Sequence, residues 1–164
     1  MKRLILLCLL ISGTIQLHAQ NDVTTFILVR HAEKSTDDPR DPSLSEEGIK
    51  RAEALKTMLS QADIAALYSS PYKRTKGTVQ PIAEAKGLEI MTYDPRSAAF
   101  LEDIMKNHKG KTIVISGHSN TTPNVVNALL GKEQFKTLSE SDYSKIFIVS
   151  VTEIGKGTVT VLSY

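Results

Sequence analysis

Two histidines and an arginine stand where their types and spacing could do chemistry together. Arg30 and His31 directly follow the apolar run 26–29, and His118 follows the segment 112–117, which is of the same kind. Such runs, rich in β-branched residues, predict strands buried on both faces of a sheet. In α/β proteins, ligand-binding residues follow the carboxyl ends of such strands. The ends of neighbouring strands lie side by side, so we expect the two imidazoles to face one another.

A second arginine extends this group. Arg74 follows another expected strand, residues 64–68, and the turn Ser69-Ser70-Pro71. Guanidinium groups pair with phosphate through two hydrogen bonds and stay charged at any working pH. An imidazole with an ordinary pKa of about 6.5 is either a nucleophile or a cation near neutral pH. The four side chains predict an anion site in which arginines hold a phosphoryl group, one neutral imidazole attacks it and the other, protonated, binds an oxygen.

Alternating strand and helix patterns position these side chains. Strands are expected at residues 24–30, 64–68, 88–93, 112–116, 146–151 and 158–162, and helices at residues 45–59, 73–86, 97–107 and 121–130. This order predicts an α/β fold with three layers, α/β/α. The sheet is expected to be mixed and mainly parallel, with helices on both faces and a C-terminal hairpin at its edge.

The first of these helices has two candidate N-caps. It begins near Ser43 or Ser45, and Ser43 with Glu46 fits a capping box. Its buried stripe is expected to contain Ile49, Ala52, Leu55 and Leu59, which recur at helical spacing.

The N-terminus carries a pattern typical of a secretory signal peptide. Lys2 and Arg3 precede an apolar stretch, residues 4–11, and small and polar residues then end in Leu17-His18-Ala19. The apolar stretch is too short to span a bilayer. We therefore predict cleavage after Ala19, one domain over residues 20–164, and an exported protein, periplasmic or secreted, without a stable membrane anchor.

Composition narrows the possible partners. The chain has 20 Lys and Arg against 18 Asp and Glu, and removal of Lys2 and Arg3 with the signal brings the net charge from +2 to about zero. This balance is not that of a nucleic-acid-binding protein. The single cysteine, Cys8, lies in the signal, so the mature chain is expected to have neither a disulfide nor a thiol nucleophile. An oligomeric state is not indicated.

The reactive residues lie in stretches that resemble the histidine phosphatase superfamily, which also contains the cofactor-dependent phosphoglycerate mutases. The matching stretches are Leu28-Val29-Arg30-His31-Ala32-Glu33-Lys34, Leu44-Ser45-Glu46-Glu47-Gly48 with Ala52, Ser69-Ser70-Pro71-Tyr72-Lys73-Arg74-Thr75 with Thr78, and Val114-Ile115-Ser116-Gly117-His118-Ser119-Asn120. The resemblance implies a phosphoglycerate mutase-like fold. It also implies that His31 forms a phosphohistidine that water hydrolyses, in a phosphate pocket of Arg30, Arg74 and His118. No cofactor and no metal are expected.

Three further site residues are left with alternatives. The general acid of this family is usually a glutamate after the third strand, where this chain has Asp94; Glu33 is the other candidate. If neither serves, substrates with good leaving groups, such as aryl or acyl phosphates, should be preferred. Asn120 either contacts the phosphate or caps the following helix. His108 is expected to be structural, at a helix C-terminus, and Lys34 to be a solvated loop charge.

The short segment 87–110 favours a phosphatase over a mutase. Its 24 residues leave little chain to cover the pocket, and an open pocket favours hydrolysis over return of the phosphoryl group to a trapped product. The expected function is therefore an exported, metal-independent phosphatase acting on a small phosphorylated substrate. The alternatives within this fold are a phosphoglycerate mutase-like transferase and an inactive module that binds phosphorylated ligands.

Two other enzyme classes fit the sequence less well. Residues 117–121 resemble the nucleophile elbow of serine hydrolases, but Thr121 replaces the closing glycine and no histidine follows Ser119. His31-Ala32-Glu33 fits the His-x-Glu element of zinc deaminases, but the mature chain lacks the cysteines that such a site requires.

Overall fold

The computed structural model describes residues 23–97 and 99–164, so the predicted signal peptide lies outside the described residues. The elements follow the expected order: β1 (Thr24–Arg30), α1 (Glu46–Met58), β2 (Ile64–Ser69), α2 (Lys73–Lys86), β3 (Ile90–Thr92), α3 (Ala99–His108), β4 (Thr112–Gly117), α4 (Thr121–Leu130), β5 (Lys145–Val151) and β6 (Thr158–Ser163). Within the described part of the chain, no helix has the length and apolar character needed to cross a membrane.

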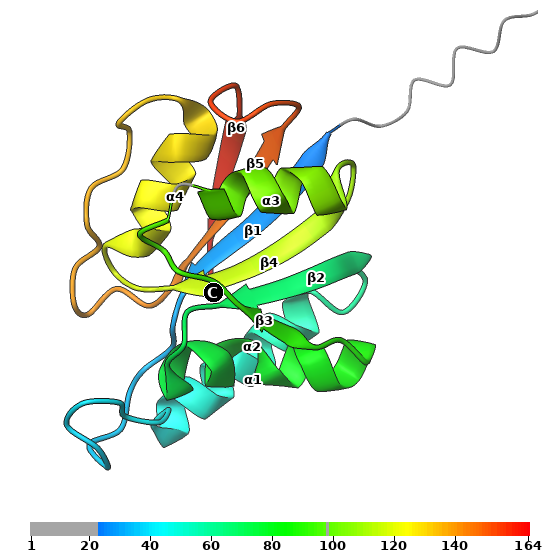
Figure 1. Ribbon diagram of the computed structural model, residues 1–164. Coiled ribbons are helices and arrows are strands. Elements are labelled where there is room, and N and C mark those ends of the chain that lie inside the picture. Colours follow the sequence, from blue (N-terminus) through cyan, green and yellow to red (C-terminus); the bar gives the residue numbers. More distant parts are fainter. Residues whose placement is uncertain (1–22, 98) are drawn as a thin grey trace, which may run out of the picture.

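The six strands form one mixed sheet in the order β3-β2-β4-β1-β5-β6 (Figure 1). The first four strands of this order run parallel to one another, whereas β5 is antiparallel to β1 and β6 is antiparallel to β5. The predicted mainly parallel sheet with a C-terminal edge hairpin is therefore confirmed.

Helices cover both faces of the sheet, which confirms the three-layer prediction. Figure 1 shows α3 and α4 over one face and α1 and α2 over the other. Alternate residues of β1 supply the two cores: Phe26 and Leu28 pack in the cluster that includes α3 and α4, and Ile27 and Val29 in the cluster that includes α1 and α2. All four side chains are almost fully buried, as expected for a central strand.

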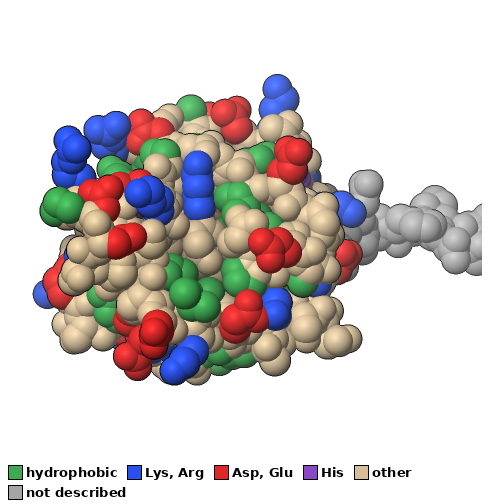
Figure 2. All heavy atoms as spheres, turned by 90° about the horizontal axis from the view of Figure 1, so that it is seen from below, with side chains coloured by type: hydrophobic (Ala, Val, Ile, Leu, Met, Phe, Trp, Pro, Cys, Tyr) green, Lys and Arg blue, Asp and Glu red, His purple; other side chains and the backbone are tan. Residues whose placement is uncertain are grey.

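The outer surface over α1 and α2 carries both signs of charge. In Figure 2, which views the molecule from this side, Lys and Arg side chains alternate with Asp and Glu, with apolar side chains between them. Neither sign dominates this face.

Strand register brings the reactive residues to one edge of the sheet. Arg30 of β1 pairs with Gly117 of β4, and Ser69 of β2 pairs with Ser116 of β4. The backbone N–H of His31 donates to the carbonyl of Gly117 at 2.9 Å, which extends the β1–β4 pairing by one residue. The chain therefore leaves three adjacent parallel strands at the same level, where a ligand site is expected.

Helix α1 differs from the prediction in its cap and in one buried position. Its N-cap is Ser45 rather than Ser43, and the Ser45 hydroxyl accepts the N–H of Gly48 at 3.1 Å. Ile49 is 54% exposed, so its expected burial was wrong, whereas Leu55 and the other expected core positions are buried. Gly48 takes the core-facing place in the first turn, because its backbone packs against the carbonyl of Glu33.

Candidate active site

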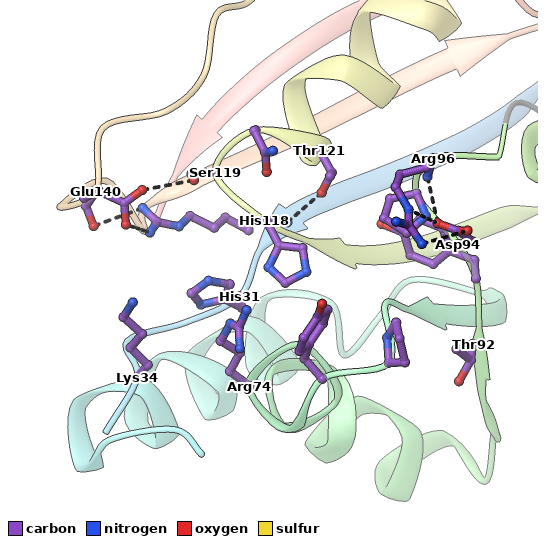
Figure 3. Close-up of a pocket in the computed structure, with 16 residues that line it drawn as sticks. His31, Lys34, Arg74, Thr92, Asp94, Arg96, His118, Ser119, Thr121 and Glu140 are labelled. Carbon is purple, nitrogen blue, oxygen red and sulfur yellow. Dashed lines mark hydrogen bonds and ion pairs between the residues drawn. The ribbon is translucent and has the colours of Figure 1, made fainter. Parts of the chain in front are cut away.

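A cavity of about 680 Å³ lies at the carboxyl ends of β1, β2 and β4, and the four predicted side chains line it (Figure 3). These are Arg30, His31, Arg74 and His118. The rings of His31 and His118 have centroids 5.5 Å apart, with 68° between their planes. The fold thus brings together four side chains from β1, α2 and the turn after β4.

The protonation of His31 follows from its one hydrogen-bond partner. Its Nδ1 lies 2.8 Å from the carbonyl oxygen of Ala32. Because a carbonyl only accepts, Nδ1 carries the proton and Nε2 keeps its lone pair. The pKa of His31 is lowered to about 4, mainly by burial of the ring. The hydrogen bond to Ala32 raises this pKa, whereas the charges of Arg30 and Arg74 lower it further. At neutral pH the ring is therefore uncharged and keeps a lone pair on Nε2.

His118 is oriented by a chain of two hydroxyl groups. Its Nε2 lies 2.9 Å from Ser70 Oγ, Ser70 Oγ donates to Thr75 Oγ1 at 3.0 Å, and Thr75 Oγ1 donates to the carbonyl of Ser70 at 2.9 Å. The chain ends on a carbonyl, so its direction requires His118 Nε2 to donate. Burial first, and then Arg74 and Arg30, lower the pKa of His118 to about 4.

Arg30 is held by the loop between α4 and β5. The side chain is 2% exposed, and its Nη1 donates to the carbonyls of Ser139, Glu140 and Asp142 at 2.7, 3.0 and 3.2 Å. The Tyr143 ring lies 4.2 Å from the guanidinium carbon. Nη2 donates to the Glu140 carboxylate at 3.0 Å, and the buried Nε has no partner among the described residues. The Nε–Nη2 edge therefore has donors to offer a bound oxyanion.

Arg74 is placed by the start of α2. Its guanidinium carbon lies 4.5 Å from the centre of the Tyr72 ring, and its Nη1 lies 3.6 Å from Asp41 Oδ1. The same carboxylate oxygen accepts the backbone N–H of Lys73 at 3.0 Å. Asp41 thus ties the loop after β1 to the first turn of α2 beside the pocket.

Two motif residues outside the pocket hold the segment after His31 in place. The backbone N–H of Ala32 donates to Thr78 Oγ1 at 2.9 Å, and this hydroxyl donates to the carbonyl of Arg74 at 2.8 Å. A Cβ atom at Gly48 would lie 2.1 Å from the carbonyl oxygen of Glu33. Only glycine fits there without a shift of the backbone that follows His31.

Neither carboxylate predicted as general acid is free to donate a proton. Asp94 lines the pocket, but it is half exposed and paired with Arg96 at 3.2 Å, and the hydrogen bonds from Arg96 lower its pKa. Glu33 does not line the pocket, because Arg51 holds both of its carboxylate oxygens at 2.7–2.9 Å. Burial alone would raise the pKa of Glu33, but the bonds from Arg51 bring it below its ordinary value.

Asn120 and Ser119 follow His118 just before α4, and the structure shows what each side chain contacts. Asn120 lines the pocket and stands at the N-cap position of α4, but its side chain makes no capping bond there; its contact with phosphate stays a prediction. Ser119 Oγ donates to Glu140 Oε1 at 3.2 Å, whereas His118 is bound to Ser70. This arrangement is not that of a serine hydrolase, in which a histidine contacts the nucleophile.

The two remaining polar expectations concern His108 and a metal site. His108 ends α3 and its Nε2 lies 3.1 Å from the hydroxyl of Tyr68, outside the pocket, which agrees with a structural role. In the part of the chain that the structure describes, no group of three or more His, Cys, Asp or Glu side chains is placed to hold a metal ion.

Sequence reasoning missed two residues that line the pocket, Tyr72 and Glu140, and one that stacks on Arg30, Tyr143. Tyr72 lies inside a matching stretch, and its ring contacts His118 at a centroid distance of 5.1 Å. Glu140 and Tyr143 lie in an irregular loop that contains no recognisable motif. Their position in the chain gave one indication: they precede β5, and β5 pairs with β1, the strand that carries Arg30.

Comparison with known proteins gives a family and a relative. Residues 26–96 match the family model of the histidine phosphatase superfamily (branch 1), a segment that contains Arg30, His31 and Arg74. Phosphoserine phosphatase 1 of Hydrogenobacter thermophilus is 46% identical over 74 residues, which are 42% of this chain and 35% of the relative. The match therefore spans about a third of the relative's length.

Solved structures share the fold over most of the chain. A mycobacterial glucosyl-3-phosphoglycerate phosphatase superposes with a TM-score of 0.73 at 14% identity, covering 86% of this chain and 99% of that one. The protein histidine phosphatase SixA, complexed with tungstate, superposes with a TM-score of 0.68 at 18% identity, covering 85% and 96%. Residues 26–96 are thus similar to the histidine phosphatase superfamily (branch 1), and the described part of the chain shares the fold of these solved phosphatases.

Proposed function

We propose that this protein is a phosphatase that hydrolyses phosphomonoesters, or related phosphoryl compounds, through a phosphohistidine on His31. One observation carries the proposal: the ring of His31 keeps Nε2 unprotonated in a cavity that it shares with His118 and two guanidinium groups. A neutral imidazole nucleophile surrounded by fixed cations is suited to attack on a phosphoryl group.

The reaction proceeds in two displacements. In the first, Nε2 of His31 forms a bond to phosphorus while the bond from phosphorus to the ester oxygen breaks, and the leaving oxygen departs as an anion that solvent water protonates. In the second, water attacks the phosphohistidine, which releases phosphate and restores the neutral ring. Arg30 and Arg74 balance the charge on the transferring oxygens in both steps.

His118 is proposed to bind the same phosphoryl group. Without a bound anion, burial and the two arginines keep the pKa of His118 low, so the ring is neutral. A phosphoryl dianion in the pocket opposes both causes, because it brings negative charge next to the ring. His118 then takes up a proton and donates to a non-bridging oxygen, while Ser70 continues to hold its Nε2.

The openness of the pocket supports hydrolysis rather than phosphoryl return. Tyr72 and Asn120 line it and are exposed to solvent. The segment between α2 and β4 contributes residues 92–96 to the lining, on one side of the cavity only (Figure 3). Water therefore has access to a phosphohistidine at His31, whereas a transferase has to exclude it.

The leaving group is proposed to be a good one. Asp94 and Glu33 are each bound to an arginine, so neither is a ready proton donor. An ester whose oxygen leaves without full protonation, such as an aryl or acyl phosphate, then reacts faster than an alkyl ester. The names of the relatives add phosphoserine and a phosphoglycerate ester to the small phosphorylated compounds worth testing.

Export is proposed from the N-terminal pattern alone. Cleavage after Ala19 would leave residues 20–164 as a periplasmic or secreted domain without a stable membrane anchor. Expression of the full chain and N-terminal sequencing of the protein recovered outside the cytoplasm tests this. A mature chain that begins near Gln20 supports export, and an intact Met1 in a cytoplasmic protein contradicts it.

The activity is tested by screening the purified protein against phosphate esters with a chelator present throughout. The panel contains p-nitrophenyl phosphate, an acyl phosphate, phosphoserine and 3-phosphoglycerate. The proposal expects hydrolysis of at least one ester at a rate that the chelator does not change. Loss of all turnover in chelator would contradict the mechanism, and vanadate binding without turnover would identify an inactive binding module.

A further inference from the structure

The side chain of Glu140 forms an ion pair with Arg30 in the pocket. Its Oε2 lies 3.0 Å from Arg30 Nη2, and its Oε1 accepts the hydroxyl of Ser119 at 3.2 Å (Figure 3). The two partners differ sharply in burial: the arginine side chain is 2% exposed and the glutamate side chain 77%. A buried cation of the pocket is thus paired with a carboxylate that reaches it from solvent.

Arg30 does not depend on this carboxylate for its orientation. Its Nη1 is fixed by the backbone carbonyls of Ser139, Glu140 and Asp142, which stay in place whatever side chain residue 140 carries. The stacked ring of Tyr143 adds a further contact. These contacts orient Arg30 without the Glu140 carboxylate.

The Glu140 carboxylate instead accepts a hydrogen bond from Arg30 Nη2, a donor that a bound oxyanion would also use. Nε and Nη2 form one edge of the guanidinium group, the edge that grips two oxygens of a phosphate. Nε has no partner among the described residues, whereas Nη2 is taken by Glu140. A phosphoryl group binding to this edge meets a negative charge that is already there.

We propose that Glu140 is an internal competitor for the phosphoryl group, displaced from Arg30 when substrate binds and returning to Arg30 as phosphate leaves. The inference rests on the proposed function, because it requires Arg30 to bind the phosphoryl group. Two charges explain the exchange: a buried guanidinium without a counter-ion is costly, and a carboxylate beside a phosphate dianion is repelled. Glu140 thereby weakens the binding of free phosphate and favours product release.

The charges around Glu140 are consistent with this role. Arg30, the nearest cation, lowers its pKa most, the hydroxyl of Ser119 adds a hydrogen bond, and Lys34 contributes from the loop after β1. The carboxylate is therefore ionised at neutral pH, as a competitor for an anion site has to be.

The test is the affinity for orthophosphate and for vanadate, measured by calorimetry in Glu140→Gln and in the unaltered protein. Glutamine keeps the size of the side chain and removes its charge, so we expect both anions to bind about two- to fivefold more tightly, the scale of one exposed ion pair. Ser119→Ala, which removes the second contact of the carboxylate, should shift both affinities in the same direction by less.

Glu153→Gln is the matched control. Glu153 is an exposed carboxylate between β5 and β6 that pairs with Lys156, so the variant loses the same charge far from the pocket. Its affinities should equal those of the unaltered protein. Anion affinity that is equal or weaker in Glu140→Gln would overturn the inference. So would an unchanged affinity with selective loss of alkyl ester turnover, which would make Glu140 a proton donor. Failure of the unaltered protein to bind either anion would instead overturn the proposed function, and this inference with it.

Discussion

His31 and His118 use different ring nitrogens for their hydrogen bonds to the protein. Nδ1 of His31 bonds the carbonyl of Ala32, whereas Nε2 of His118 bonds the hydroxyl of Ser70. His31 is thereby left with Nε2 and His118 with Nδ1 for other partners. Because the rings lie 5.5 Å apart in one cavity, two imidazoles of opposite tautomer can take different roles, one as nucleophile and the other as phosphate ligand.

The first prediction concerns the titration of these rings in the free protein. Burial lowers the pKa of both histidines from 6.5 to about 4. Nuclear magnetic resonance of the imidazole protons should show two rings that stay neutral down to about pH 4, assigned with His31→Gln and His118→Gln. Bound vanadate should raise the pKa of His118, because the anion stabilises the imidazolium. Titration of both rings near pH 6.5 in the free protein would contradict the buried, neutral pair.

The second prediction concerns the hydroxyl chain behind His118. Ser70→Ala removes the acceptor of the His118 Nε2 proton, and a lost buried hydrogen bond costs about 1–3 kcal/mol. We expect kcat/KM to fall by about tenfold and the pKa of His118 to change, a readout that a merely structural serine would not affect.

Ser116→Ala is the control for that variant. The Ser116 hydroxyl is also buried, near the end of β4, but it has no hydrogen-bond partner among the described residues. Its removal should leave kcat/KM close to that of the unaltered protein. Equal losses in the two variants would show that burial of a serine, not its bond to His118, explains the effect.

The third prediction separates Asp94 from the chemistry. Because the pKa of Asp94 is lowered by its bonds from Arg96, the carboxylate is ionised and has no proton to give. Asp94→Asn should therefore slow alkyl and aryl phosphates by the same small factor. Steady-state kinetics on one ester of each kind decides the matter, since a proton donor would slow the alkyl ester far more. Selective slowing of the alkyl ester would restore Asp94 as the acid.

The fourth prediction concerns stability. Gly48→Ala places a methyl group against the carbonyl oxygen of Glu33, so the start of α1 has to shift, at a cost of about 1–3 kcal/mol. Urea unfolding should register this loss, together with lower activity, because Glu33 is two residues from His31. Gly77→Ala in α2 is the control: its methyl group meets only the flexible side chain of Leu44, so a change under about 1 kcal/mol is expected. A stable Gly48→Ala would mean that this glycine is not required by packing.

The core of the site was predictable because strong local signals coincided with simple geometry. The strands at 24–30 and 112–117 contain distinctive apolar runs, and the ends of neighbouring parallel strands have to lie together. Arg30 and the two histidines are placed by this rule alone. Arg74 needed in addition the turn that separates its helix from β2.

The rest of the site depends on contacts that no local pattern encodes. Glu140 and Tyr143 reach Arg30 across more than 100 residues of chain, from a loop without periodicity. Glu33 was expected in the pocket because it lies close to His31, but Arg51 draws its carboxylate to α1. Ile49 followed the helical period of its apolar neighbours, yet Gly48 faces the core instead. In each case a partner distant in the sequence decided the side chain's position.

The most direct measurement is the detection of a phosphoryl group on His31. The protein is mixed with an aryl phosphate, quenched in base, in which phosphohistidine survives, and mapped by mass spectrometry. We expect modification of the peptide that contains His31, its absence in His31→Ala, and a fall in turnover of at least about a thousandfold in that variant, or about 4 kcal/mol. His108→Gln, which changes a histidine outside the pocket, should keep both signals. Turnover that survives in His31→Ala, or a phosphoryl group found on His118 instead, would contradict the account.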